Sequence, residues 1–171
     1  DGTFDNNRAI GSNTATIAAV DMSKTVLLFS ASCGNDTPDQ VLVGGEITNT
    51  TTLTFQRDGS GTAAEIEWQV LEFSSGVSVQ RGATDINTHP KDVTITSVNT
   101  AQSFVTLSYR NDGSTFGNDD LASAELTSST NLQFVSNTTT GKIAYWQVVE
   151  NNGAAVQMVK DSLTDASAER K

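Results

Sequence analysis

The chain has 171 residues, a formal net charge of −10 and a single cysteine, Cys33. The acidity disfavours a nucleic-acid partner, which needs clustered Lys and Arg, and also disfavours an anionic membrane surface. One cysteine allows no disulfide within the chain, and we expect Cys33 to be a small, half-buried apolar residue.

Residues 1–13 carry no hydrophobic periodicity and are predicted to form an N-terminal arm. Phe4 and Ile10 are its large apolar side chains, and we expect them to tie the arm to another surface. The chain begins at Asp1 rather than Met, which leads us to expect a processed or trimmed product. The arm is therefore the first candidate for a contact made during assembly.

A first β-repeat is predicted over residues 14–82. Short apolar or alternating runs bounded by Gly, Asn, Asp and Ser are typical of strands. They predict strands over residues 16–20, 24–30, 41–47, 51–57, 64–73 and 77–81. The last two are expected to form a hairpin around Ser74-Ser75-Gly76, and Gly44-Gly45 indicates a bulge or a close backbone approach.

A second repeat follows because one motif occurs twice. Residues 65–72, with the sequence EIEWQVLE, return at residues 143–150 as IAYWQVVE. The motif contains both tryptophans of the chain, Trp68 and Trp146, which are 78 residues apart. We predict a linker over residues 83–92, the second repeat over 93–160, and a C-terminal tail over 161–171 with helix-compatible composition.

The predicted fold is all-β, because no segment before the tail has a sustained 3.6-residue pattern. Two tandem antiparallel β-sandwiches, or small barrels, of about six strands each fit the repeats. A repeat of this size buries only a thin core. Each half should therefore rest on its neighbour or on an oligomeric partner.

Successive side chains of a strand point to opposite faces. Trp68 and Trp146 lie on the more apolar face of their strands and are predicted as core anchors, with stacking on a sugar ring as the alternative. The other face also ends apolar, at Leu71 in one copy and at Val149 in the other. A strand apolar on both faces is covered on both. The sister repeat or another subunit would supply the second cover.

Several polar residues also recur between the repeats. We interpret them as side chains that bond a neighbouring strand, with a ligand-binding or metal-binding cluster as the alternative. The recurring pairs are Gln69 with Gln147, Glu72 with Glu150, Glu46 with Glu125, and Gln80 with Gln157.

A Gly-Asn-Asp sequence occurs in the equivalent loop of each repeat. Oxygen-rich loops of this kind can hold Ca²⁺, but they are also ordinary turn sequences. The oxygen donors are Asn35, Asp36, Asp39, Asn118, Asp119 and Asp120. Their spacing matches no established calcium loop, so we expect turns and neither a metal nor a cofactor.

The chain contains no nucleophile elbow, phosphate loop, dinucleotide fingerprint or His/Cys pair for zinc. Its only histidine, His89, lies in the predicted linker. No apolar stretch approaches the length of a membrane span. These observations predict a protein that is not an enzyme.

Residues 66–73 (IEWQVLEF) and 76–82 (GVSVQRG) resemble repeat modules of phage and phage-associated bacterial proteins. The resemblance covers residues 14–160, and the second repeat departs from it after Glu150, where Met158 replaces Arg81. It implies a virion structural protein, such as a capsid decoration or a head or tail fibre subunit. The Trp strand is also similar to H-type lectin domains.

Three functions fit these observations. The first is a homo-oligomeric virion structural protein whose partners are other virion subunits. The second is a carbohydrate-binding adhesin or lectin that recognises a surface glycan. The third is a subunit of a bacterial extracellular filament. All three imply a virion-surface or extracellular location.

Overall fold

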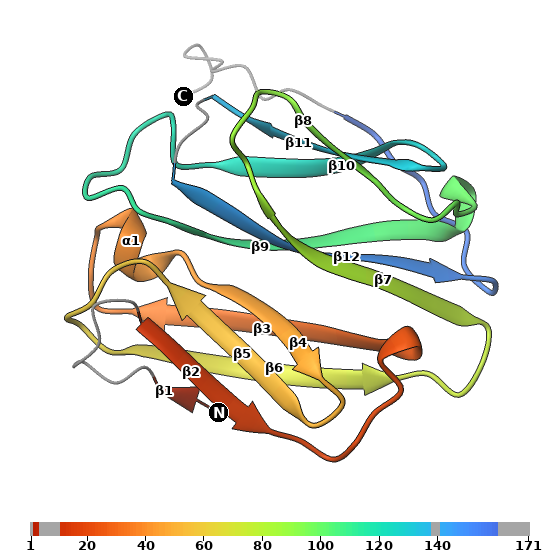
Figure 1. Cartoon of the computed structure of the whole chain (residues 1–171), viewed down its shortest axis with the longest axis horizontal. Coiled ribbons are helices and arrows are strands. Elements are labelled where there is room, and N and C mark those ends of the chain that lie inside the picture. Colours follow the sequence, from red (N-terminus) through yellow and green to blue (C-terminus); the bar gives the residue numbers. More distant parts are fainter. Residues whose placement is uncertain (1, 4–10, 138–140, 161–171) are drawn as a thin grey trace, which may run out of the picture.

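The computed structural model describes residues 2–3, 11–137 and 141–160. Its strands form four three-stranded antiparallel sheets, so the chain is all-β as predicted (Figure 1). The strands of the first half are β1 (Gly2–Thr3), β2 (Gly11–Thr16), β3 (Thr25–Cys33), β4 (Gly44–Asn49), β5 (Thr52–Arg57) and β6 (Ala64–Glu72). Those of the second half are β7 (Val77–Asp85), β8 (Lys91–Thr94), β9 (Ser103–Asn111), β10 (Ala122–Ser128), β11 (Asn131–Ser136) and β12 (Lys142–Asn151).

The first module consists of β1–β6. One sheet has the order β1-β6-β3 and the other has the order β2-β5-β4. Alternate residues of β5 are buried, including Leu53 and Phe55, because one face of this strand meets the opposite sheet. Leu27 of β3 and Ile66 of β6 complete the core between the two sheets.

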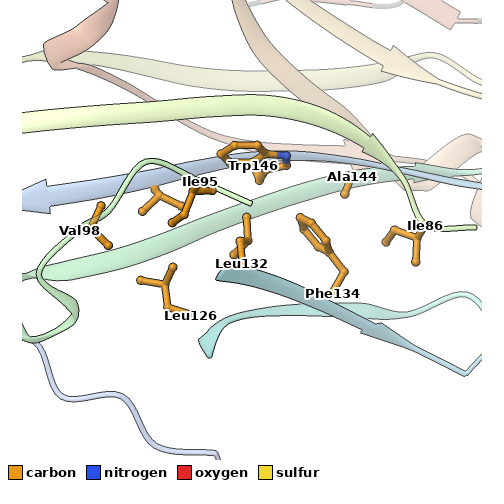
Figure 2. Packing of buried hydrophobic residues seen from close by; sticks show 9 residues of the cluster. Ile86, Ile95, Val98, Leu126, Leu132, Phe134, Ala144 and Trp146 are labelled. Atoms are coloured by element: carbon orange, nitrogen blue, oxygen red, sulfur yellow. The ribbon is translucent and has the colours of Figure 1, made fainter. Parts of the chain in front are cut away.

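The second module consists of β7–β12 and repeats this plan. Its sheets have the orders β7-β12-β9 and β10-β11-β8. Figure 2 shows its core, in which Trp146 from β12 lies over Leu132 and Phe134 from β11. Each module therefore encloses its own apolar core between two antiparallel sheets.

The three helical segments within the described residues are short. They are the 3-10 turns η1 (Met22–Lys24) and η2 (Thr100–Gln102) and the one-turn helix α1 (Pro38–Val41). The two 3-10 turns occupy equivalent places before β3 and β9. Asp21 caps the first and Asn99 caps the second, each accepting a hydrogen bond from a backbone N–H two residues ahead.

The predicted hairpin between residues 64–73 and 77–81 is wrong. β7 does not return along β6 but crosses to the second module, where it pairs with β12 over nine residues (Figure 1). Gly82 explains part of this choice, because a Cβ there would lie only 2.7 Å from the Trp146 ring. The strand fits beside Trp146 of the second module, and residues 77–85 are the edge strand of that module's sheet.

Other predicted boundaries also shift. The strand expected over residues 16–20 lies earlier, as β2, which takes residues 11–13 from the expected arm and pairs them with β5. The strand expected over 41–47 begins at Gly44, because Pro38 starts the helix α1. The expected linker 83–92 contains the end of β7 and the start of β8. Phe4, Ile10 and the tail 161–171 lie outside the described residues.

Candidate assembly interface

The junction between the modules is formed by a sheet face and two strand edges. β3 is an edge strand of its sheet. β4 contacts β12 and β9, and β3 meets the outer face of the same sheet through Val26 and Leu27. At the centre, the Gln147 side-chain oxygen accepts from the backbone N–H of Leu27 at 2.9 Å. Its amide nitrogen donates to the Leu27 carbonyl at 2.8 Å. One side-chain amide thus satisfies both backbone hydrogen-bonding groups of Leu27, as a neighbouring strand would.

An apolar cluster closes one end of the junction. Val26 of β3, Val79 of β7 and Val149 of β12 are buried together, and Val149 is only 1% exposed. The row Val79–Val149 belongs to the second module, and Val26 is contributed by the first. The second cover predicted for the motif strand is therefore the sister module in this copy.

Polar contacts close the other end. The Tyr145 hydroxyl donates to the Gln56 side chain, and the Arg110 guanidinium pairs with Asp58 across the junction. The backbone approaches closely here, since a Cβ on Gly44 would lie 2.2 Å from the Tyr145 ring. The expected close approach at Gly44-Gly45 is the point where β4 meets β12.

β7 connects the two modules through side chains as well as through the backbone. Gln80 donates to the Thr96 carbonyl at 2.8 Å and accepts from the Thr96 N–H at 2.7 Å. Arg81 donates to the carbonyl of Thr25 in the first module. Burial lowers the pKa of the Arg81 guanidinium, although a guanidinium remains protonated under ordinary conditions.

Among the described residues, the equivalent face of the first module has no such cover. Gln69 of β6 corresponds to Gln147, and Leu71 corresponds to Val149, at the same spacing of 78 residues. Both side chains are exposed, and Leu71 is 38% exposed. β1 pairs with only two residues of β6, Glu65 and Ile66. In the part of the chain that the structure describes, that side of β6 has no strand partner from Trp68 onward.

The two predicted core anchors differ in the same way. Trp146 is 9% exposed, and its indole N–H donates to Thr84 of β7 at 3.0 Å. Trp68 is half-buried against the first core. Its indole nitrogen is enclosed and has no hydrogen-bond partner among the described residues. The difference follows from the residue beside each ring, because β7 places Thr84 opposite Ala144, whereas β1 places Gly2, which has no hydroxyl, opposite the matching Ile66.

Two recurring glutamates have matching structural roles. Glu72 accepts from the Asp21 N–H at 2.8 Å, and Glu150 accepts from the Asn99 N–H at 2.7 Å. Each therefore holds the turn in front of β3 or β9. Glu46 and Glu125 are less alike: partial burial raises the pKa of Glu46, and Glu125 pairs with Lys160 at 3.1 Å.

The loop residues considered for calcium make hydrogen bonds within their own loops. The Asn35 side-chain oxygen accepts from the backbone N–H groups of Asp36 and Thr37. Asp120 accepts from the Gly117 N–H, and the Lys142 ammonium lies 2.6 Å from the Asp119 carbonyl, which places a positive charge in that loop. Among the residues placed by the structure, no three His, Cys, Asp or Glu side chains gather in a way that could hold a metal ion.

A cleft of about 330 Å³ opens beside the junction. Phe29, Tyr109 and Tyr145 supply its aromatic lining, and other residues of β3 and β9 form much of the rest. Burial is the main cause that raises the pKa of Tyr109, so its phenol is neutral under ordinary conditions.

Sequence patterns pointed to part of this junction. The recurring glutamines and the Gly44-Gly45 pair were visible, whereas Val26, Arg110 and Asp58 were missed. Their roles depend on which edge of the first module meets which face of the second, and no local pattern encodes that choice.

The chain matches no family model, no curated protein and no solved structure. No helix within the described ranges is long and apolar enough to cross a bilayer. The geometry of the two modules and of their junction therefore carries the functional argument.

Proposed function

We propose that this chain is a non-enzymatic structural subunit of a surface assembly, a virion decoration or a head or tail fibre. Its work is to join β-sandwich modules in series. The observation that carries the proposal is the junction itself, in which the strand edges of one module cover the sheet face of the next. The face that corresponds to the covered one remains open on the first module.

The chemistry of the junction supports a permanent contact. The Gln147 side-chain amide satisfies both backbone groups of Leu27 on β3, and valines from both modules are buried beside it. Interfaces with an apolar core and satisfied polar groups are typical of stable assemblies. A subunit that already stacks two modules in this way is suited to a fibre or a surface layer.

His89 and Cys33, whose side chains could take part in catalysis, lie in different modules and make structural contacts there. His89 accepts from the Ser136 N–H in the second module at 3.3 Å. Cys33 lies in the first module, where Arg57 donates to its sulfur at 3.7 Å. A thiol and an imidazole on different modules do not form a nucleophile and base, and this supports a role without catalysis.

The test is composition of purified particles. We expect quantitative mass spectrometry to find the chain in density-purified virions at many copies per particle, and antibody labelling to place it on the outside. Recovery only in sheared extracellular filaments would favour the bacterial filament subunit instead. Recovery in neither fraction would overturn both structural functions.

A carbohydrate-binding adhesin is the second candidate, and the cleft beside the junction favours it. Its volume lies at the lower end of the range for small-ligand sites. Trp146 is buried and cannot stack on a sugar, so Tyr109 is the residue to test. Binding on a glycan array that Tyr109→Ala removes would support the adhesin, and an empty array would rule it out.

A further inference from the structure

We propose that a second copy of this chain covers the open face of the first module, so that copies join head to tail. The contact repeats the junction within the chain: the end of the second module of one copy meets the β1-β6-β3 sheet of the next. This inference rests on the proposed structural function and names its partner.

The apolar cluster of the internal junction has a complete counterpart on the two free ends. Val26 corresponds to Phe104, Val149 to Leu71, and Val79 to Val156. Phe104 and Leu71 are 37% and 38% exposed, although both are large apolar side chains on strands. Phe104 and Val156 line one groove at the end of the second module. When that end meets β6 of the next copy, Phe104 and Val156 close over Leu71.

The recurring glutamines have matching counterparts. Gln147 holds both backbone groups of Leu27, and the equivalent pair is Gln69 with the backbone of Val105. Gln80 holds both backbone groups of Thr96, and the equivalent pair is Gln157 with the backbone of Ala18. Gln69, Gln157 and Ala18 are exposed in the single chain. Both pairs therefore join the second-module end of one copy to the first module of the next copy.

The bare edge of β6 accepts the segment that follows β12. Within the chain, β7 follows β6 and pairs with β12, with Val79 opposite Val149. The corresponding segment, residues 154–158, follows β12 and has no strand partner among the residues that the structure describes. In the same register, Val156 lies opposite Leu71 of the next copy, and an added strand satisfies the exposed backbone of an edge.

The pairing ends before Trp68. Gly82 leaves room for Trp146 in the internal junction, and residues 154–160 carry no glycine at the matching place. The polar end of the junction also differs, because Tyr145 and Arg110 correspond to Glu67 and Ser32. The contact between copies therefore consists of the apolar cluster, the two glutamine pairs and a short strand.

In the single chain the donated segment is held loosely. The Val156 N–H donates to the Ala101 carbonyl, and exposed Lys160 pairs with Glu125. Exposed ion pairs of this kind contribute little to stability, so they present a small barrier to rearrangement. A heterologous contact of this type builds an open series or a closed ring of copies rather than a symmetric dimer.

The first experiment is sedimentation velocity on the 171-residue chain over a roughly hundredfold range of concentration. The buffer should contain about 0.15 M salt, because each copy carries a net charge of −10. We expect dimers, trimers and longer species that grow with concentration. Leu71→Arg and Val156→Asp should each leave a monomer with an unchanged circular dichroism spectrum.

Thr14→Arg is the matched control, because Thr14 is exposed on a strand of the other sheet of the first module. It should assemble like the unaltered chain. Assembly of Leu71→Arg to the native extent would overturn the proposal, as would a monomer at every concentration.

The second experiment tests the register. Chains carrying Leu71→Cys are mixed with chains carrying Val156→Cys and oxidised, and peptide mapping should find a disulfide between positions 71 and 156. A mixture of Val156→Cys with Thr14→Cys should give none between 156 and 14. Cross-links only between two copies of position 71 would indicate a symmetric dimer and overturn the proposal. A monomeric chain that is nevertheless present on virions would overturn this inference and leave the proposed function standing.

Discussion

The strands β6 and β12 carry the same motif but lie in different surroundings. β12 has a strand on each side, a core on one face and the first module on the other, and its Tyr145 and Val149 are buried. β6 has β3 along one edge and two residues of β1 on the other, and its Leu71 is exposed. The same motif therefore allows a strand to be buried on both faces. Its position in the chain decides whether another module covers the outer face.

The two tryptophans give the largest expected difference. Trp146→Ala removes a buried ring and its bond to Thr84, and should lower the free energy of unfolding by about 3–5 kcal/mol. Trp68→Ala should cost about 1–2 kcal/mol, because the ring is already half-exposed and its N–H has no partner among the described residues to lose. Urea unfolding of monomeric samples measures both. Equal losses would contradict the difference in environment.

The two glutamines give the next difference. Gln147→Ala removes both side-chain partners of the Leu27 backbone at the junction, and should cost about 2–3 kcal/mol. Gln69→Ala, its exposed counterpart, should change the stability of the monomer by less than about 0.5 kcal/mol. The same denaturation experiment, below the concentration at which copies associate, compares the two. A loss for Gln69→Ala as large as that for Gln147→Ala would show that β6 is already covered.

Substitutions at Gly44 of β4 and at its counterpart Ser123 of β10 test how closely each strand is packed. Gly44→Ala places a Cβ against the Tyr145 ring and should cost about 1–3 kcal/mol, because β4 must move away from β12. Ser123→Ala should be nearly neutral, since Ser123 is exposed on β10. The shift in midpoint of thermal unfolding distinguishes them. A neutral Gly44→Ala would mean that the junction is looser than its geometry indicates.

The smallest expected effect concerns Glu46 and its counterpart Glu125. Burial raises the pKa of Glu46 above its ordinary value of 4.5, so the folded state disfavours the ionised form. Its contribution to stability is fully present below the unfolded pKa and is lost as pH rises through the folded pKa. Glu46→Gln should therefore raise the unfolding midpoint slightly at pH 7 and leave it unchanged at pH 4.

Glu125→Gln is the matched control for this experiment. Glu125 loses only an exposed ion pair with Lys160, so the variant should produce no gain at pH 7. A gain of similar size in both variants would argue against burial as the cause of the Glu46 effect.

Much of the fold could be predicted because strand alternation is local. The all-β class, the two copies and the strands that became β3, β5, β6 and β12 follow from period-two patterns and turn residues. The pairing of β7 could not be predicted in this way. Val77 to Arg81 has the composition and the short preceding turn of a hairpin strand, and only the row Val79–Val149 and the fit of Gly82 beside Trp146 decide where it pairs.

The sequence by itself determined that this protein consists of two alike β-modules with recurring Trp, Gln and Glu residues, since these depend on spacing along one strand. Tertiary structure alone decided what each repeated residue does. Gln147 meets the edge of β3 because the modules stack edge to face, whereas Gln69 is exposed and no second module covers it among the described residues. Contacts between distant strands depend on the order of the modules, and identical motifs therefore acquire different neighbours.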